Sequence, residues 1–137
     1  MKADRVVVDT NVLISALLLP AGPPGLVVTH LANSNATLLL SRVTFLELAT
    51  RLDRPKFDRY RTRAQMNRYL EWLADVAEWI KPSICIEACR DPDDNRFLEV
   101  LVAGDGDVLI SGDADLLALH PFEGRPIVAP GVFLAEL

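Results

Sequence analysis

The feature of this sequence that most constrains its fold is an alternation of short aliphatic runs with longer amphipathic segments. The runs are rich in valine, leucine and isoleucine, and turn residues bound them, which is typical of buried strands. Five of them are predicted as strands, at residues 5–8, 37–40, 84–86, 108–110 and 127–128. Strands that alternate with helices form a mostly parallel sheet with helices on both faces. We therefore predict an α/β fold, a three-layer α/β/α sandwich around a central sheet.

The segments between these runs carry helix signals. Ser41 is a good N-cap for a helix over 42–52, and Thr62 is a good N-cap for a long helix that reaches about Ile80. An acid at Asp93 or Asp94 starts a helix that ends near residue 103. The remaining predicted helices cover residues 11–18, 25–32, 113–119 and 131–137.

Length and composition favour one folded unit. The chain has 137 residues, of which 50% are hydrophobic, so we predict a single domain over residues 1–137. Its longest largely apolar segment, Val12 to Leu19, has eight residues, one of which is Ser15. A membrane span needs about 20, and the run lacks the flanks of a signal peptide. We expect a cytoplasmic protein without a membrane partner.

The charges are unevenly distributed. The net charge of −5 argues against a general nucleic-acid binder. Residues 51–68, however, hold seven basic and two acidic side chains, whereas residues 87–115 hold nine acidic and two basic ones. Such a split is compatible with two solvated faces, or with a phosphate-binding surface beside a metal site.

Four acids in four separate elements are the candidates for chemistry: Asp9, Glu47, Asp94 and Asp113. Asp9 ends the first predicted strand and Asp113 follows the fourth, so both fall at the carboxyl edge of a parallel sheet, where function gathers. Carboxylates that converge repel one another, and a divalent cation removes that repulsion. An oxygen-only set suits Mg²⁺ or Mn²⁺. Such an ion can activate water and hold a phosphoryl group, which points to phosphodiester hydrolysis.

Other interpretations of these residues were weighed. Asp94 and Asp113 also suit simple helix caps. Residues 91–95 match the first half of a calcium loop, but Arg96 stands where that loop needs glycine. The two cysteines and two histidines lack zinc-ligand spacing. A non-catalytic acidic α/β binding module, or a receiver-like phospho-acceptor domain, remains the alternative function.

Four stretches together carry a family resemblance. They are Val6 to Ser15; Leu46-Glu47-Leu48 with the following Arg54-Pro55-Lys56-Phe57; Asp91 to Leu98; and Ser111 to Leu117. In order and spacing they resemble PIN-domain ribonucleases, in particular the toxin components of VapBC-like toxin–antitoxin pairs. The resemblance covers essentially the whole chain and implies a parallel sheet with flanking helices, RNA as substrate, and Mg²⁺ or Mn²⁺ held by the four acids.

The resemblance also assigns secondary roles. It implies that Thr10, Asn11 and Ser111 support the metal ligands, with Asp115 as an accessory acid. Asp91 and Asp93 crowd the third acidic position, so either could replace Asp94. With RNA as the implied substrate, we expect the basic segment to contact the RNA backbone through the following side chains: Arg51, Arg54, Lys56, Arg59, Arg61 and Arg63.

The resemblance further implies partners, namely a homodimer and an antitoxin whose basic side chain reaches the acids. The expected interface comprises apolar residues 17–19 and a stripe of Trp72 and Trp79 on the long predicted helix. Edge-of-core packing is the other explanation for the two tryptophans. His30 and His120 are expected at the surface without a chemical role.

Overall fold

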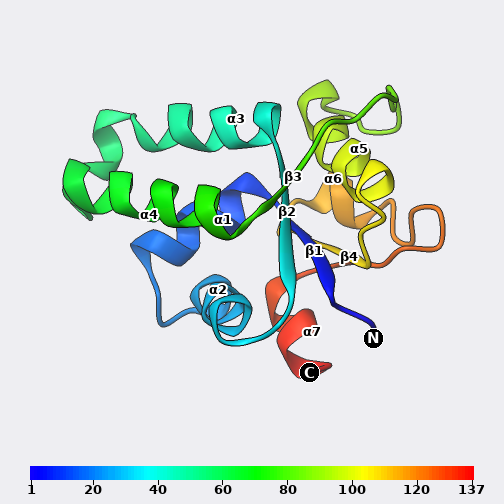
Figure 1. Ribbon diagram of the computed structural model, residues 1–137, viewed down its shortest axis with the longest axis horizontal. Coiled ribbons are helices and arrows are strands. Elements are labelled where there is room, and N and C mark those ends of the chain that lie inside the picture. Colours follow the sequence, from blue (N-terminus) through cyan, green and yellow to red (C-terminus); the bar gives the residue numbers. More distant parts are fainter.

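The computed structural model describes residues 1–137 and contains a five-stranded parallel sheet (Figure 1). The strands β1 (Arg5–Val8), β2 (Thr37–Ser41), β3 (Glu78–Ile80), β4 (Val108–Ile110) and β5 (Ile127–Val128) have the order β3-β2-β1-β4-β5. Every neighbouring pair is parallel; Val6 pairs with Leu38 on one side and with Val108 on the other. The predicted parallel α/β fold is confirmed.

Seven α-helices cover the two faces of the sheet. They are α1 (Thr10–Leu18), α2 (Pro23–Asn33), α3 (Arg42–Leu52), α4 (Arg63–Val76), α5 (Asn95–Ala103), α6 (Ala114–Leu117) and α7 (Pro130–Ala135). Two short 3₁₀ turns, η1 (Pro55–Phe57) and η2 (Pro92–Asp94), precede α4 and α5. No single helix is long and apolar enough to span a membrane; only the bent pair of α1 and α2 passes on length and composition together.

Alternating side chains of each strand divide the core into two layers. Val6 and Val8 point into a larger cluster with α1, α2, α3, α4 and α7. Val7 points into a smaller cluster with Phe97 of α5 and Leu116 of α6. Successive strand residues face opposite sides of a sheet, so three consecutive valines serve both cores. In Figure 1, α5 and α6 accordingly lie on the other side of the sheet from α2 and α7.

The predicted third strand was wrong. Strand β3 is Glu78–Ile80, which pairs with Leu39–Ser41, while residues 84–86 belong to no strand. The long helix therefore ends at Val76, because Ala77 adopts an extended conformation with ψ of 149°. Ile80 packs against the smaller core as a strand residue. Its position in the sequence also matches the apolar periodicity of the preceding helix, which is why the helix was predicted to extend to it. Trp79 consequently lies on β3 and shares no helical stripe with Trp72.

Other boundaries agree closely with the predictions. Helix α3 occupies the predicted residues, and Ser41 and Thr62 both form capping boxes. One expectation about the histidines was wrong: His30 is half-buried, with its ring 5.8 Å from that of Phe133 in an edge-on contact. His120 is exposed, and its Nδ1 accepts a hydrogen bond from the Ile127 N–H.

Candidate functional site

Asp9 lies at the carboxyl end of β1, where the strand passes directly into α1. The residue is only 3% exposed, and its backbone N–H donates to the Ile110 carbonyl of the neighbouring strand. Oδ2 accepts a 2.8 Å hydrogen bond from the Ser111 hydroxyl, and Oδ1 accepts one from the Asn11 N–H. Burial raises the pKa of Asp9, while the Ser111 hydrogen bond works in the opposite direction. The side chain is thus held in one orientation at a place where a lone charge is unfavourable.

Asp113 and Asp94 reach the same edge from two other elements. Asp113 follows β4, caps α6 with its side chain, and its N–H donates to the Ser111 hydroxyl at 3.0 Å. Asp94 stands at the junction of η2 and α5, where its side chain makes no capping hydrogen bond with the helix. Burial, a hydrogen bond with Asp113 and the Asp113 charge together raise the pKa of Asp94 to about 7. The neighbouring Asp113 carboxyl group thus makes ionisation of Asp94 unfavourable.

Glu47 joins this edge from α3. The Thr10 hydroxyl donates to its Oε2 at 3.2 Å, and the Arg51 guanidinium lies 2.6 Å from its Oε1. Burial raises the pKa of Glu47, and the Arg51 charge counteracts that rise. Arg51 also donates to the Asn11 side-chain oxygen at 2.9 Å. Arg51 is the one cationic side chain that forms an ion pair with any of the four predicted acids.

The four acids influence one another through their charges. Asp113 raises the pKa of Asp9, and Asp9 in turn raises the pKa values of Asp94 and Glu47. As the side chains stand, however, no three His, Cys, Asp or Glu residues have the arrangement of a metal-ion site. The structure therefore gathers the predicted acids at one edge of the sheet without forming a closed coordination shell.

The accessory residues have separate positions. Ser111 is fully buried and joins Asp9 to the Asp113 backbone. Asp91 is exposed and caps η2 by accepting from the Asp93 N–H, so its oxygen has a local structural use. The Asp115 N–H donates to the Asp113 side chain at 2.8 Å, which fixes the Asp113 carboxylate.

The side chains of the predicted basic segment have three kinds of surroundings. Arg51 and Arg54 line a cavity of about 420 Å³ beside Glu47. Arg63 forms ion pairs with Asp53 and Asp58 at 2.8 and 3.0 Å. The others engage aromatic or backbone groups: Lys56 lies over the Phe57 ring, Arg59 lies over the Tyr60 ring, and Arg61 donates to the Tyr60 carbonyl.

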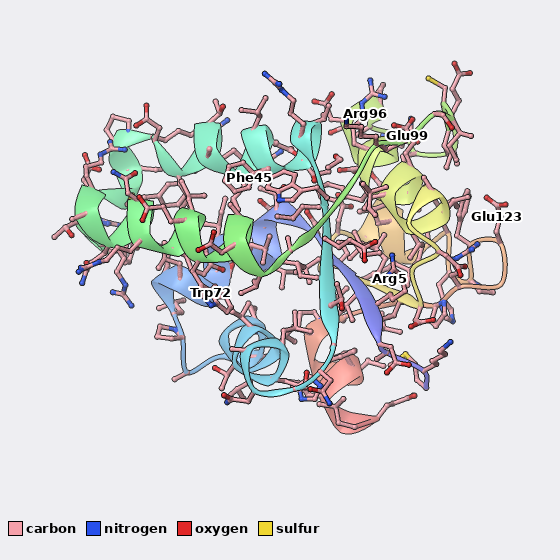
Figure 2. The ribbon with its side chains drawn as sticks, viewed as in Figure 1. Arg5, Phe45, Trp72, Arg96, Glu99 and Glu123 are labelled. Carbon is pink, nitrogen blue, oxygen red and sulfur yellow. The ribbon has the colours of Figure 1, made fainter.

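Two residues that the sequence analysis did not single out contribute to the site. Arg96, at the start of α5, lines the same cavity as Arg51 and lies beside Glu99, with which it pairs at 3.2 Å (Figure 2). Buried Asn95 accepts hydrogen bonds from the Ala88 and Cys89 N–H groups and so fixes the loop before η2. The helical periodicity places Arg96 on the solvent face of α5, but only the fold shows that this face adjoins α3.

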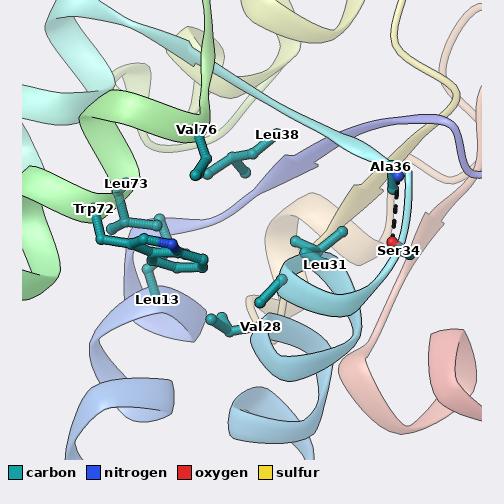
Figure 3. A pocket seen from close by; sticks show the side chains of 10 residues that line it. Leu13, Val28, Leu31, Ser34, Ala36, Leu38, Trp72, Leu73 and Val76 are labelled. Atoms are coloured by element: carbon teal, nitrogen blue, oxygen red, sulfur yellow. Dashed lines mark hydrogen bonds between the residues drawn. The ribbon is translucent and has the colours of Figure 1, made fainter.

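A second hollow lies away from the acids. It has a volume of about 190 Å³ and lies among α1, α2, β2 and α4 (Figure 3). Trp72, Leu31 and Val76 line it, and nine of its ten lining residues are hydrophobic. Without a charged group, it offers no chemistry for hydrolysis. Of the expected interface residues, Leu19 is 65% exposed, whereas Leu17 and Leu18 are half-buried against the core.

Comparisons with known proteins agree with this fold. Residues 5–115 match the family described as PIN domain. The chain is 34% identical over 119 residues to the uncharacterized protein MJ1680 of Methanocaldococcus jannaschii, covering 85% of this chain and 75% of that protein.

Two solved structures have similar folds. The crystal structure of PAE2754 from Pyrobaculum aerophilum has a TM-score of 0.64 and 16% identity, covering 96% of this chain and 88% of that one. The crystal structure of VapBC2 from Rickettsia felis, bound to a DNA fragment from its promoter, has a TM-score of 0.59 and 13% identity, covering 91% of this chain and 98% of that one.

Proposed function

Because the chain belongs to the PIN-domain family, whose members are generally nucleases, we propose that it is a metal-dependent endoribonuclease that hydrolyses RNA phosphodiester bonds. The observation that supports this most is the meeting of Asp9, Glu47, Asp94 and Asp113 at one sheet edge with a single paired cation. Purely structural acids are ordinarily paired one by one, because unpaired buried charge is destabilising.

The donor set fits Mg²⁺ or Mn²⁺. All four side chains offer oxygen only, which hard divalent cations prefer. The contact between Asp94 and Asp113, with the pKa of Asp94 raised to about 7, indicates that this pair needs either a proton or a cation at neutral pH. A bound ion of this class would activate a water molecule and neutralise charge on the phosphoryl group.

The protein groups have distinct proposed roles. Ser111 and the Asn11 N–H hold the Asp9 carboxylate in one orientation, and Thr10 does the same for Glu47. Asp9 and Asp94 are proposed as the principal ligands, whereas Glu47 and Asp113 complete the set or orient the attacking water. Because that water is the nucleophile, the products should carry a 5′-phosphate and a 3′-hydroxyl.

The RNA backbone is proposed to lie along the cavity beside Glu47. Arg51, Arg54 and Arg96 line it, so three cations flank a path that leads to the acids. Arginine forks suit phosphate oxygens. Leu46 and Val43, each about half exposed, line the same cavity and offer apolar surface for a base or ribose. Arg59, Arg61 and Arg63 remain proposed contacts farther along the strand.

We also propose a biological role for the chain, supported by its structural similarity to VapBC2. VapBC2 from Rickettsia felis has a similar fold to this chain. The chain is proposed to be the toxin of a toxin–antitoxin pair, active on cytoplasmic RNA, with an antitoxin partner and a homodimeric state. Growth arrest on expression of the wild-type chain, but not of Asp9→Asn, tests the toxin role; light scattering at high concentration tests the dimer.

Cleavage of a mixed RNA pool tests the enzymatic core of the proposal. We expect cleavage with Mg²⁺ or Mn²⁺, none with EDTA, and ligation-competent 5′-phosphate ends. Cyclic-phosphate ends, or equal cleavage in EDTA, would contradict the mechanism. A preparation of Asp9→Asn, purified identically, serves as the control for contaminating nucleases.

A further inference from the structure

Arg51 holds a position that the other basic residues of the chain do not share. Its guanidinium joins α3 to the start of α1, through Glu47 Oε1 at 2.6 Å and Asn11 Oδ1 at 2.9 Å. Both partners belong to the acid site, since Asn11 also fixes Asp9 through its backbone N–H. Arg51 therefore occupies a carboxylate oxygen that an incoming cation would use.

The same guanidinium faces open space on its other side. Arg51 lines the cavity of about 420 Å³ together with Arg54 and Arg96, and its side chain is 29% exposed. No helix or loop needs to move for the side chain to leave Glu47 and enter this cavity, because rotamer changes of partly exposed side chains are fast and local. Arg51 thus stands between the acid cluster and the proposed RNA path.

We propose that Arg51 is an internal counter-ion of the acid site, which exchanges from Glu47 to an RNA phosphate when a divalent cation binds. The inference rests on the proposed function, because it assumes that the site takes a cation and RNA. It assigns Arg51 a positioning role that differs from that of Arg54, which lines the same cavity but has no side-chain ion pair or hydrogen bond in the structure.

Charge balance explains why this exchange is favourable. Without a cation, Glu47 is half-buried near other acids, and Arg51 at 2.6 Å is its only ion-pair partner. With a cation bound, that neutralisation is redundant and a second positive charge nearby is repelled. The phosphate of a bound strand then becomes the better partner for a planar guanidinium. Cation and RNA binding are thereby linked through one side chain.

Mn²⁺ titration of the full chain by calorimetry, without RNA, tests the first half of the exchange. Arg51→Ala removes the competing cation, so we expect it to bind Mn²⁺ about threefold to fivefold more tightly than the wild type, the range of a partly exposed ion pair. Arg51→Lys keeps the charge but loses the fork, and should shift the affinity by less. Arg54→Ala, the matched control, should change it by less than about twofold, because more distant exposed charges are screened.

RNA binding with and without a cation tests the second half. The probe is a short single-stranded RNA, measured by fluorescence anisotropy in EDTA and again in Ca²⁺, which also fills oxygen-only sites; a gel verifies that the RNA stays intact. Arg51→Ala should weaken binding and lower the salt slope by about one only in Ca²⁺. Arg54→Ala should weaken it in both buffers.

The outcomes separate this inference from the proposed function. If the wild-type chain binds no Mn²⁺, the proposed function fails and the exchange fails with it. If the wild type binds Mn²⁺ but Arg51→Ala binds it equally or more weakly, only the exchange is overturned. An equal effect of Arg51→Ala on RNA affinity in EDTA and in Ca²⁺ would also overturn the exchange.

Discussion

The two ends of the parallel sheet both carry many charges, but they neutralise them in different ways. At the amino end, the Asp107 carboxylate accepts from the Asp4 and Arg5 N–H groups, and the Arg5 side chain forms a double hydrogen bond with Glu78. Arg125 similarly pairs with Asp105. Each of these three acids, Asp107, Glu78 and Asp105, has its own donor.

At the carboxyl end the acids outnumber their cationic partners. Asp94 meets another carboxyl group, Asp113, and only Arg51 supplies a positive charge to the group. We infer that the paired charges of the amino end stabilise the fold, whereas the crowded acids of the carboxyl end are arranged for a ligand. Strongly perturbed pKa values are typical of functional sites. Substitutions at one end at a time test this difference.

The largest expected effect is on catalysis by the carboxyl end. Asp9→Asn keeps the size of the side chain and one acceptor oxygen but removes the charge, so the fold should persist while RNA cleavage falls by at least about a hundredfold. Initial rates with Mn²⁺ measure the loss, and circular dichroism verifies the fold. Asp107→Asn is the matched control at the amino end and should retain the wild-type rate; a comparable loss there would erase the distinction.

The amino end should respond in stability instead. Asp107→Ala removes the acceptor of two backbone N–H groups, at 3.0 and 2.9 Å. We expect unfolding free energy to fall by about 1–3 kcal/mol, the usual range for lost charge-assisted hydrogen bonds, with cleavage unchanged below the melting transition. Urea denaturation measures it. A stable variant with lost activity would contradict the structural role of this end.

A smaller effect distinguishes the basic residues. Arg54→Ala should weaken RNA binding about twofold to fivefold and lower the salt slope by about one, because its side chain is free to contact phosphate. Arg63→Ala should do less, since Arg63 is already neutralised by Asp53 and Asp58. Anisotropy titrations at several salt concentrations compare the two. An equal loss of RNA affinity in the two variants would contradict this distinction, because Arg63 would then contribute to RNA binding as much as Arg54.

The last prediction concerns the pH dependence of stability without metal. The pKa of Asp94 is raised from 3.8 to about 7, so the folded state binds its proton more tightly, and stability is lost as the pH rises from about 4 to 7. The pKa of Glu78 is lowered by its hydrogen bond with Arg5, so that contribution is lost as the pH falls below the ordinary glutamate range. Melting curves in EDTA should show the first trend weakened in Asp94→Asn, and an unaltered trend there would refute this assignment.

Much of the fold could be predicted because local signals and tertiary packing agree. The Ser41 and Thr62 capping boxes fixed two helix starts, and the three valines of β1 identified a strand buried on both faces. The error at β3 arose because Ile80 satisfies both a helical and a strand pattern, and the pairing of residues 78–80 with β2 involves residues nearly forty positions away. That non-local pairing has no signal in a short window.

The proximity of Asp9 and Asp113 could be predicted from the sequence, but the pairing of the neighbouring side chains could not. Topology brings residues after β1 and β4 to one edge, so the proximity of Asp9 and Asp113 follows from a parallel sheet. The contacts of Arg51 with Glu47 and Asn11 depend on how α3 packs beside α1. The contact of α5 with α3 brings Arg96 to the cavity, whereas Arg63 is paired with acids of its own segment. The sequence places Arg51 and Arg63 in one basic segment and does not distinguish their roles.

Thermal unfolding during Mn²⁺ titration tests most directly whether the carboxyl-end acids form a cation site. At about a hundredfold excess over the dissociation constant, binding adds about 2.7 kcal/mol to stability, which is roughly 5–10 °C in melting temperature for a chain of this length. We expect this rise in melting temperature for the wild type and for Asp107→Ala, and no rise for Asp9→Asn. An unchanged wild-type melting temperature, or an equal rise in Asp9→Asn, would contradict it.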